Sequence, residues 1–359
     1  MTVNSLVLVV VRVEVAAAVA IVAVLLGAGS LRRRRAHKEA MVRALVRQRV
    51  TSALVGRGAP SGGPGKLSKR TRRDAIHAVA EYARTIGGAD RGTLAGVAGQ
   101  FGLSAYTKRL AASMFWWHRL EAARLVTLFG LSSADVRRMA ADGHWLVRAQ
   151  AATAAGSWRM QKALPLLITM LSDDAPLCRF EAKQALVQMG VDGARAVGDA
   201  LREGIELAAG TELNARRTDG LLDVAASTPQ ADMVDLGLAY SRSPRDTTRC
   251  SATALLAALG GPAATDRLIE LLDDDMGNVR CAAARALGTS GAWSGASALA
   301  RHLDDESYDV RLAVATALQR LGAPGTLMLR RVADTGSGRA ADMARQTLDI
   351  VEQLSPVGA

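Results

Sequence analysis

The chain has 359 residues, which is enough for two ordinary domains or one long array, so its length excludes neither arrangement. Aromatic residues make up only 4% of the sequence, and this scarcity favours closely packed helices over a sheet core, so we predict an all-α protein. The formal net charge is +11, but residues 31–73 hold fourteen Lys or Arg against one acid. The rest of the chain carries −2, which makes nucleic acid an unfavourable partner for it.

The first segment, residues 1–31, is predicted to be a transmembrane anchor. Its apolar stretch Val13–Leu31 would rise roughly 28 Å as a helix, enough to cross a bilayer core. A cleavable signal peptide carries its positive charges before the apolar stretch, whereas here they follow it, at Arg32, Arg33, Arg34, Arg35 and Lys38. Positive flanks stay in the cytoplasm. We therefore expect a single-pass protein of the cell (inner) membrane, with its amino terminus outside and residues 32–359 in the cytoplasm.

Two charges lie within the anchor. Arg12 and Glu14 fall near the outer interface, where the arginine can extend towards the headgroups. A contact with another transmembrane helix is the alternative reading of this pair.

Residues 32–55 follow as a basic juxtamembrane helix that is apolar on one side. Two interpretations carry near-equal weight: the helix lies along the anionic inner leaflet, or it is a solvated stalk. Residues 56–70 include "GRGAPSGGPG", which has no apolar periodicity and predicts a flexible linker.

Residues 71–118 are expected to form a divergent amino-terminal helical cap, because an end repeat has only one neighbour to pack against. Phe115, Trp116 and Trp117 are the densest aromatic cluster in the chain. We expect them to pack in the core or cap, and a contact with a partner protein or with the membrane interface is the alternative.

Internal repeats dominate residues 119–354. Segments such as "LLDDDMGNVRCAAARALG" and "HLDDESYDVRLAVATALQRLG" share an acidic turn, a Val-Arg pair, an alanine-rich helix and a closing glycine. Four arginines have an aspartate six positions earlier, and the pairs are Asp142 and Arg148, Asp173 and Arg179, Asp274 and Arg280, and Asp305 and Arg311. Weaker copies begin at Arg119, Arg216 and Arg249, so the period is near 31 residues. Two helices per period predict stacked helical hairpins.

These units resemble the short bacterial HEAT repeats, also called PBS-lyase HEAT-like repeats. The resemblance covers about residues 119–350 and implies a right-handed α-solenoid behind the one transmembrane helix. It is specific for architecture and weak for activity, because such arrays serve unrelated functions.

Elementary chemistry accounts for the repeated residues. A carboxylate in the turn can accept hydrogen bonds from free amides at the next helix start, and each arginine can bridge carboxylates and carbonyls, so we predict a structural ladder of these groups. Gly156 and Gly288 come eight positions after their arginine, and we expect their helices to be about one turn shorter. Trp158 and Trp293 would then plug the space that is left.

The sequence holds no motif for catalysis, and no catalytic, cofactor-binding or metal-ligating residue is assigned. HEAT hydroxylases hold iron with His-Glu pairs, but no histidine of this chain is followed by Glu. We therefore expect a membrane-tethered scaffold for protein partners, with a membrane enzyme of envelope or polysaccharide assembly as one possible partner. The candidate contact residues are Glu121, Arg124, Glu181, Lys183, Gln184, Trp116 and Trp117. The alternatives are a bilin lyase-like or hydroxylase-like enzyme, and lipid or nucleic-acid contact through residues 31–73.

Overall fold

The computed structural model describes residues 36–56, 65, 67–86, 90–130, 133–207 and 212–354, and these form helices joined by short turns. The predicted anchor, residues 1–31, and the basic residues Arg32, Arg33, Arg34 and Arg35 lie outside the described residues. Within the described part, no helix combines the length and the apolar composition that crossing a bilayer requires. The described residues divide into two compact units. The first ends at Gly130, and the described part of the second begins at residue 133.

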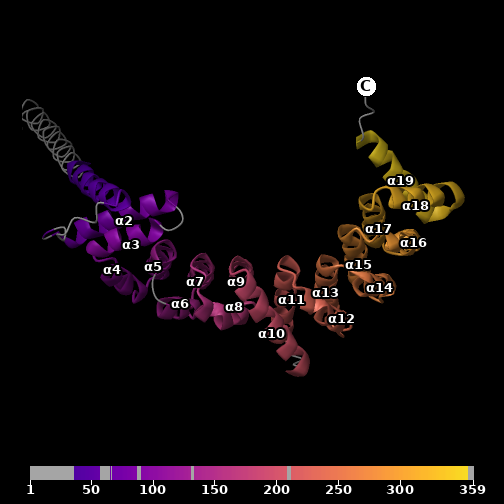
Figure 1. Ribbon diagram of the computed structural model, residues 1–359, viewed down its shortest axis with the longest axis horizontal. Helices are drawn as coiled ribbons and strands as arrows, with labels where there is room; N and C mark the ends of the chain where they lie inside the picture. The colour runs from indigo at the N-terminus through magenta and orange to yellow at the C-terminus, as the bar shows by residue number, and fades with distance from the viewer. Residues whose placement is uncertain are drawn as a thin grey trace, which may run out of the picture. The chain divides into compact units, whose positions relative to one another are not determined.

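The first unit is a bundle of short helices (Figure 1). It contains a helix over residues 36–54, α2 (Lys69–Thr85), α3 (Asp90–Gln100), α4 (Leu103–Ala111) and α5 (Trp116–Phe129). Its core holds Ile76 and Leu94, which are 1% and 0% exposed. Ser68 caps α2, since its hydroxyl accepts a hydrogen bond from the Thr71 amide.

The 36–54 helix packs into this unit. Val46 and Val50 on its apolar side are 0% and 3% exposed. Arg49 bonds the Gln100 side chain and lies over the ring of Phe101, 6.0 Å from its centre. Met41 on the same helix is 62% exposed, so protein covers the apolar side only around Val46 and Val50, and the leaflet and stalk interpretations stay predictions.

The second unit is two rows of helices. The arginine row contains the helices that carry the repeated arginines, and they pack side by side in chain order (Figure 1). This row is α7 (Trp145–Ser157), α9 (Pro176–Gln188), α11 (Glu212–Ser227), α13 (Asp246–Leu259), α15 (Gly277–Ser290) and α17 (Tyr308–Arg320). The second row is α6 (Ser133–Ala140), α8 (Leu164–Met170), α10 (Val191–Leu207), α12 (Val234–Tyr240), α14 (Pro262–Glu270), α16 (Ala296–Arg301) and α18 (Ala323–Thr335).

Short 3-10 turns join or extend several of these helices, and α19 (Gly338–Leu354) packs on α17 and α18 at the end of the unit. The turns are η1 (Gln161–Ala163), η2 (Ala231–Met233), η3 (Leu271–Asp273), η4 (Trp293–Gly295) and η5 (His302–Asp304). The core between the rows is mostly leucine and alanine, with Leu287 and Leu318 fully buried. Small alanines let neighbouring helices approach closely, as the composition predicts.

The expectation that the helices containing Gly156 and Gly288 are about one turn shorter is wrong. Both helices continue past the glycine, α7 to Ser157 and α15 to Ser290. A Cβ at Gly288 would lie 2.7 Å from the Cα of Ala317 on the next helix of the row. These glycines therefore mark the closest approach of two backbones, and Trp293, which is 71% exposed, plugs no gap.

Candidate functional site

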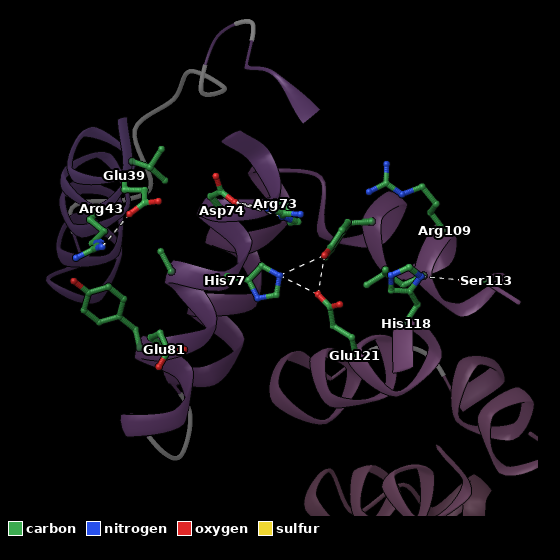
Figure 2. Close-up of a pocket in the computed structure, with 15 residues that line it drawn as sticks. Glu39, Arg43, Arg73, Asp74, His77, Glu81, Arg109, Ser113, His118 and Glu121 are labelled. Carbon is green, nitrogen blue, oxygen red and sulfur yellow. Dashed lines mark hydrogen bonds and ion pairs between the residues drawn. The ribbon is translucent and has the colours of Figure 1, made fainter. Parts of the chain in front are cut away.

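The first unit contains a cleft of about 1070 Å³ whose lining includes most of its histidines and several of its charged side chains (Figure 2). One wall is the 36–54 helix and α2, and the facing wall is α4 and α5. This volume is at the upper end of what pockets for small molecules occupy. The lining also includes less polar side chains, namely Val42, Ala78, Tyr82 and Leu110.

The hairpin of α4 and α5 sets the geometry of the facing wall. The two helices run antiparallel across a short turn, so Tyr106 on α4 lies opposite Glu121 on α5. The Tyr106 hydroxyl donates a hydrogen bond of 2.7 Å to Glu121 Oε1. His77 reaches the same oxygen from α2, with Nε2 2.9 Å from Glu121 Oε1 and 3.3 Å from Tyr106 Oη. A carboxylate only accepts hydrogen bonds, so Nε2 of His77 carries the proton.

Tyr106 stays protonated in this network. Burial raises the pKa of Tyr106, and the adjacent Glu121 carboxylate raises it further, although the positive charges of Arg73 and Arg109 oppose the shift. The hydroxyl therefore remains a hydrogen-bond donor and holds the Glu121 side chain of α5 against α4.

Most charges around the cleft are paired with a neighbour on their own helix. Arg43 lies 3.6 Å from Glu39, and Arg73 lies 3.2 Å from Asp74. Arg109 is different, because no carboxylate pairs with it among the described residues, and its guanidinium sits 5.4 Å from the centre of the Tyr106 ring. The cleft thus has one cation held by an aromatic face and open to a ligand.

His118 lines the cleft one helical turn before Glu121. Its Nδ1 lies 3.0 Å from the Ser113 hydroxyl, which also accepts a hydrogen bond of 3.3 Å from the Phe115 amide. Ser113 stands six positions before Arg119, so it takes the turn position that aspartate occupies in the clear repeats. Ser113 therefore has a structural role in the turn. Within the described part of the chain, no group of three or more His, Cys, Asp or Glu could hold a metal ion.

An aromatic patch adjoins this end of the cleft. Phe115 and Trp117 stack at 4.6 Å between ring centres, and both rings contact the His118 imidazole edge to face. Met114, Phe115 and Trp117 are 86%, 43% and 50% exposed, and Trp116 is 36% exposed. The expected core packing of this cluster is therefore not what the structure shows, and the exposure favours the alternative, a surface contact.

The arginine row of the second unit is tied together by the repeated acids and arginines. Arg148 Nε and Nη2 bond both oxygens of Asp173 at 2.7 and 2.8 Å, and Arg148 Nη1 bonds the carbonyl of Asp142 in its own turn. The same two-pronged contact joins Arg280 to Asp305 at 2.8 and 3.0 Å. Each of these arginines therefore links its own turn to the turn of the next repeat.

Two further features complete this ladder. Arg249 bonds both oxygens of Asp274, although its own turn carries Ser243 in place of aspartate. Arg179 and Arg311 bond the carbonyls of Asp173 and Asp305 in their own turns.

These carboxylates are held ionised by their partners. Burial alone raises the pKa of Asp305, but the Arg280 guanidinium and the Ser307 amide outweigh it and hold that pKa below its usual range. The pKa values of Asp173 and Asp274 are lowered in the same way, by Arg148 and Arg249.

The candidate contact residues on the arginine row fall into two groups. Glu181 and Lys183 on α9 bond side chains of neighbouring helices, Thr153 at 2.9 Å and Asp223 respectively. Gln184, also on α9, is exposed. In the first unit, Arg124 and Lys38 are exposed, whereas Glu121 is engaged in the cleft.

Sequence reasoning did not single out His77, Tyr106, Arg109 or His118. The available signal was a pair of i, i+3 spacings on consecutive helices, Tyr106 with Arg109 and His118 with Glu121. Antiparallel packing brings these two pairs face to face. His77 could not be found in this way, because it arrives from a helix 29 residues earlier.

Comparisons with known proteins agree with this architecture. The family profile for HEAT repeats matches residues 103–186, 136–212, 233–319 and 266–348. No curated protein sequence matches the chain. Among solved structures, importin beta is similar with a TM-score of 0.52 at 15% identity, over 81% of this chain and 45% of that one.

Two other solved structures are similar at TM-scores below 0.5. The CpcE–CpcF complex of phycocyanin lyase from Nostoc sp. PCC7120 has a TM-score of 0.37 at 21% identity, over 68% of this chain and 93% of that one. Human deoxyhypusine hydroxylase has a TM-score of 0.30 at 19% identity, over 70% of this chain and 96% of that one. At these identities the likeness extends to the helical-repeat fold alone.

Proposed function

Because this chain belongs to the HEAT-repeat proteins, we propose that it is a membrane-tethered scaffold that binds a protein partner along the arginine row. The observation that supports this most is the continuous packing of α7, α9, α11, α13, α15 and α17 in one row. Such a row offers a long surface that is assembled from many repeats and needs no single catalytic residue.

The ladder makes that surface a rigid one. Its arginine–aspartate pairs are charge-assisted and two-pronged, and their side chains are about a tenth exposed, 11% for Arg280 and 7% for Asp305. A partner that binds across several repeats therefore meets a surface that is already ordered, which lowers the entropy lost on binding.

The tether is the second part of the proposal. It rests on the apolar segment at residues 1–31 and the basic residues that follow it. A fixed position beside the bilayer raises the local concentration of the repeats near a membrane partner. Deletion of residues 1–31 is expected to move the protein from the membrane to the soluble fraction, and retention of the deleted form in the membrane would contradict the tether.

Site-specific crosslinking tests the scaffold. A photoreactive amino acid at Gln184, exposed on the arginine row, is expected to capture a partner in intact cells. The matched control is the same amino acid at Asp266, which is exposed on α14 in the second row. Equal capture of one protein from both positions, or none from Gln184, would contradict binding along the arginine row.

A further inference from the structure

We propose that the Arg109 and His118 end of the cleft binds the phosphate of an anionic phospholipid headgroup at a bilayer surface. Met114, Phe115 and Trp117 would then enter the interfacial layer beside it. This inference rests on the tether in the proposed function and assigns the first unit a binding role of its own.

The register of the α4–α5 hairpin places the two side chains together. Tyr106 on α4 is bonded to Glu121 on α5 at 2.7 Å. Moving three residues along each antiparallel helix leads from Tyr106 to Arg109 and from Glu121 to His118. Both residues line the cleft, and Figure 2 shows them next to each other on its facing wall.

The electrostatics of this end suit a phosphate. Arg109 is exposed, and no carboxylate pairs with it among the described residues, so its donors are available to a ligand. Lys108 beside it is also exposed. The Nδ1 of His118 is engaged by Ser113, which leaves its Nε2 for a ligand. A guanidinium matches the geometry of phosphate oxygens, and basic residues are attracted by the negative surface potential of an anionic leaflet.

The neighbouring aromatic patch favours a bilayer over a dissolved anion. Met114 is 86% exposed, and Trp117, whose ring contacts the His118 imidazole, is 50% exposed. Tryptophan is enriched where one end of a side chain is apolar and the other is wet, as at a bilayer interface. The Arg109 guanidinium would then contact the headgroup phosphate while the exposed aromatic residues contact the adjacent acyl chains.

The chain also limits how far this cleft can lie from the bilayer. Glu39 and Arg43 on its other wall come eight and twelve residues after Leu31, where the predicted anchor ends. Even a fully extended chain of eight residues spans at most about 28 Å. If residues 1–31 cross the membrane, the cleft is held within reach of its surface.

The test is native mass spectrometry of the full chain in detergent, titrated with phosphatidylglycerol or with phosphatidylcholine. We expect tighter binding of phosphatidylglycerol, and a loss of about tenfold in that binding for Arg109→Gln, since the variant lacks the charge-assisted hydrogen bonds to the phosphate. The matched control is Arg84→Gln, which removes the same charge from an exposed position near the carboxyl end of α2 and should change binding less than about twofold. Circular dichroism establishes that both variants are folded.

Three results would overturn the proposal. They are equal binding of the two lipids by the wild-type chain, equal losses for the two arginine variants, and full competition by glycerol phosphate alone. The last result would indicate a site for a dissolved anion. None of these outcomes affects the crosslinking at Gln184 or the fractionation of the anchor deletion, so failure here is distinguishable from failure of the scaffold or of the tether.

Discussion

Substituting Gly288 by alanine tests the close approach of α15 and α17. The added Cβ would lie 2.7 Å from Ala317 Cα, 2.9 Å from Ala317 Cβ and 3.3 Å from the Ala317 carbonyl oxygen. Carbon atoms in contact prefer a separation of about 3.5–4.0 Å, so the two helices must separate by about 1 Å. The obstructing atoms belong largely to backbone and cannot rotate away.

The expected magnitude follows from two opposing effects. Overpacking of this kind costs about 1–3 kcal/mol. Alanine in place of glycine in a helix returns about 1 kcal/mol. We therefore expect Gly288→Ala to lower the free energy of unfolding by about 1 kcal/mol, and Gly156→Ala, whose Cβ would meet Ala185 Cα at 2.7 Å, to do the same.

The control is Gly96→Ala in α3, where a Cβ meets nothing within 4 Å. This substitution should raise stability by about 0.4–1 kcal/mol, because it removes freedom from the unfolded chain. Denaturant unfolding followed by circular dichroism measures all three variants, and the midpoint is compared because repeat arrays need not unfold in one step. Equal stabilisation by Gly288→Ala and Gly96→Ala would refute the reasoning.

Three further outcomes are expected. Asp305→Asn should lower the free energy of unfolding by about 2 kcal/mol, since the nearly buried Arg280 then keeps only Glu306, which is 87% exposed and 3.6 Å away. Asp342→Asn, in a pair 55% and 75% exposed, should change it by less than about 0.5 kcal/mol. Because the folded pKa of Asp305 is lowered, its contribution is complete above the unfolded pKa and is lost as the pH falls through the folded value. Acid titration should therefore destabilise the wild type more steeply than Asp305→Asn, and parallel curves would contradict this. Burial raises the pKa of Cys250 to about 11. Its reaction with a thiolate-specific reagent at pH 8 should therefore be about 100-fold slower than that of an ordinary thiol of pKa 9, because its thiolate fraction is smaller by that factor. A rate equal to that of free cysteine would contradict the burial of this thiol.

The repeated part of the fold could be predicted because its information is local. Each repeat carries its own acidic turn, its arginine and its alanine-rich helix within about 31 residues, so the period alone predicts the hairpin. The helical ends at Gly190 and Gly322 are likewise local, and both glycines have the positive φ, 62° and 69°, that such an end requires.

The remainder depended on contacts between distant residues. The sequence does not distinguish a glycine that ends a helix from one that accommodates a neighbouring backbone. For that reason it predicts a helix end at Gly288, where the structure has a close contact with α17. The apolar side of residues 36–54 was equally ambiguous, because a covered side and a lipid-facing side have the same periodicity. The cleft required three separate helices to bring His77, Tyr106 and Glu121 together, and no spacing in the sequence encodes that meeting.

The direction of the ladder has a consequence for how such proteins change in length. Arg148, Arg249 and Arg280 each bond a carbonyl of their own turn and the acid of the unit that follows, so a duplicate of a unit that carries the turn aspartate arrives with the acid that its predecessor needs. Insertion of such a unit next to Arg280 therefore leaves no charge unmatched, and arrays of different lengths can arise there without compensating substitutions. Arg311 is on the last helix of the row, and its guanidinium lies 5.5 Å from the centre of the Tyr308 ring, so an aromatic face takes the place of the next acid at this end.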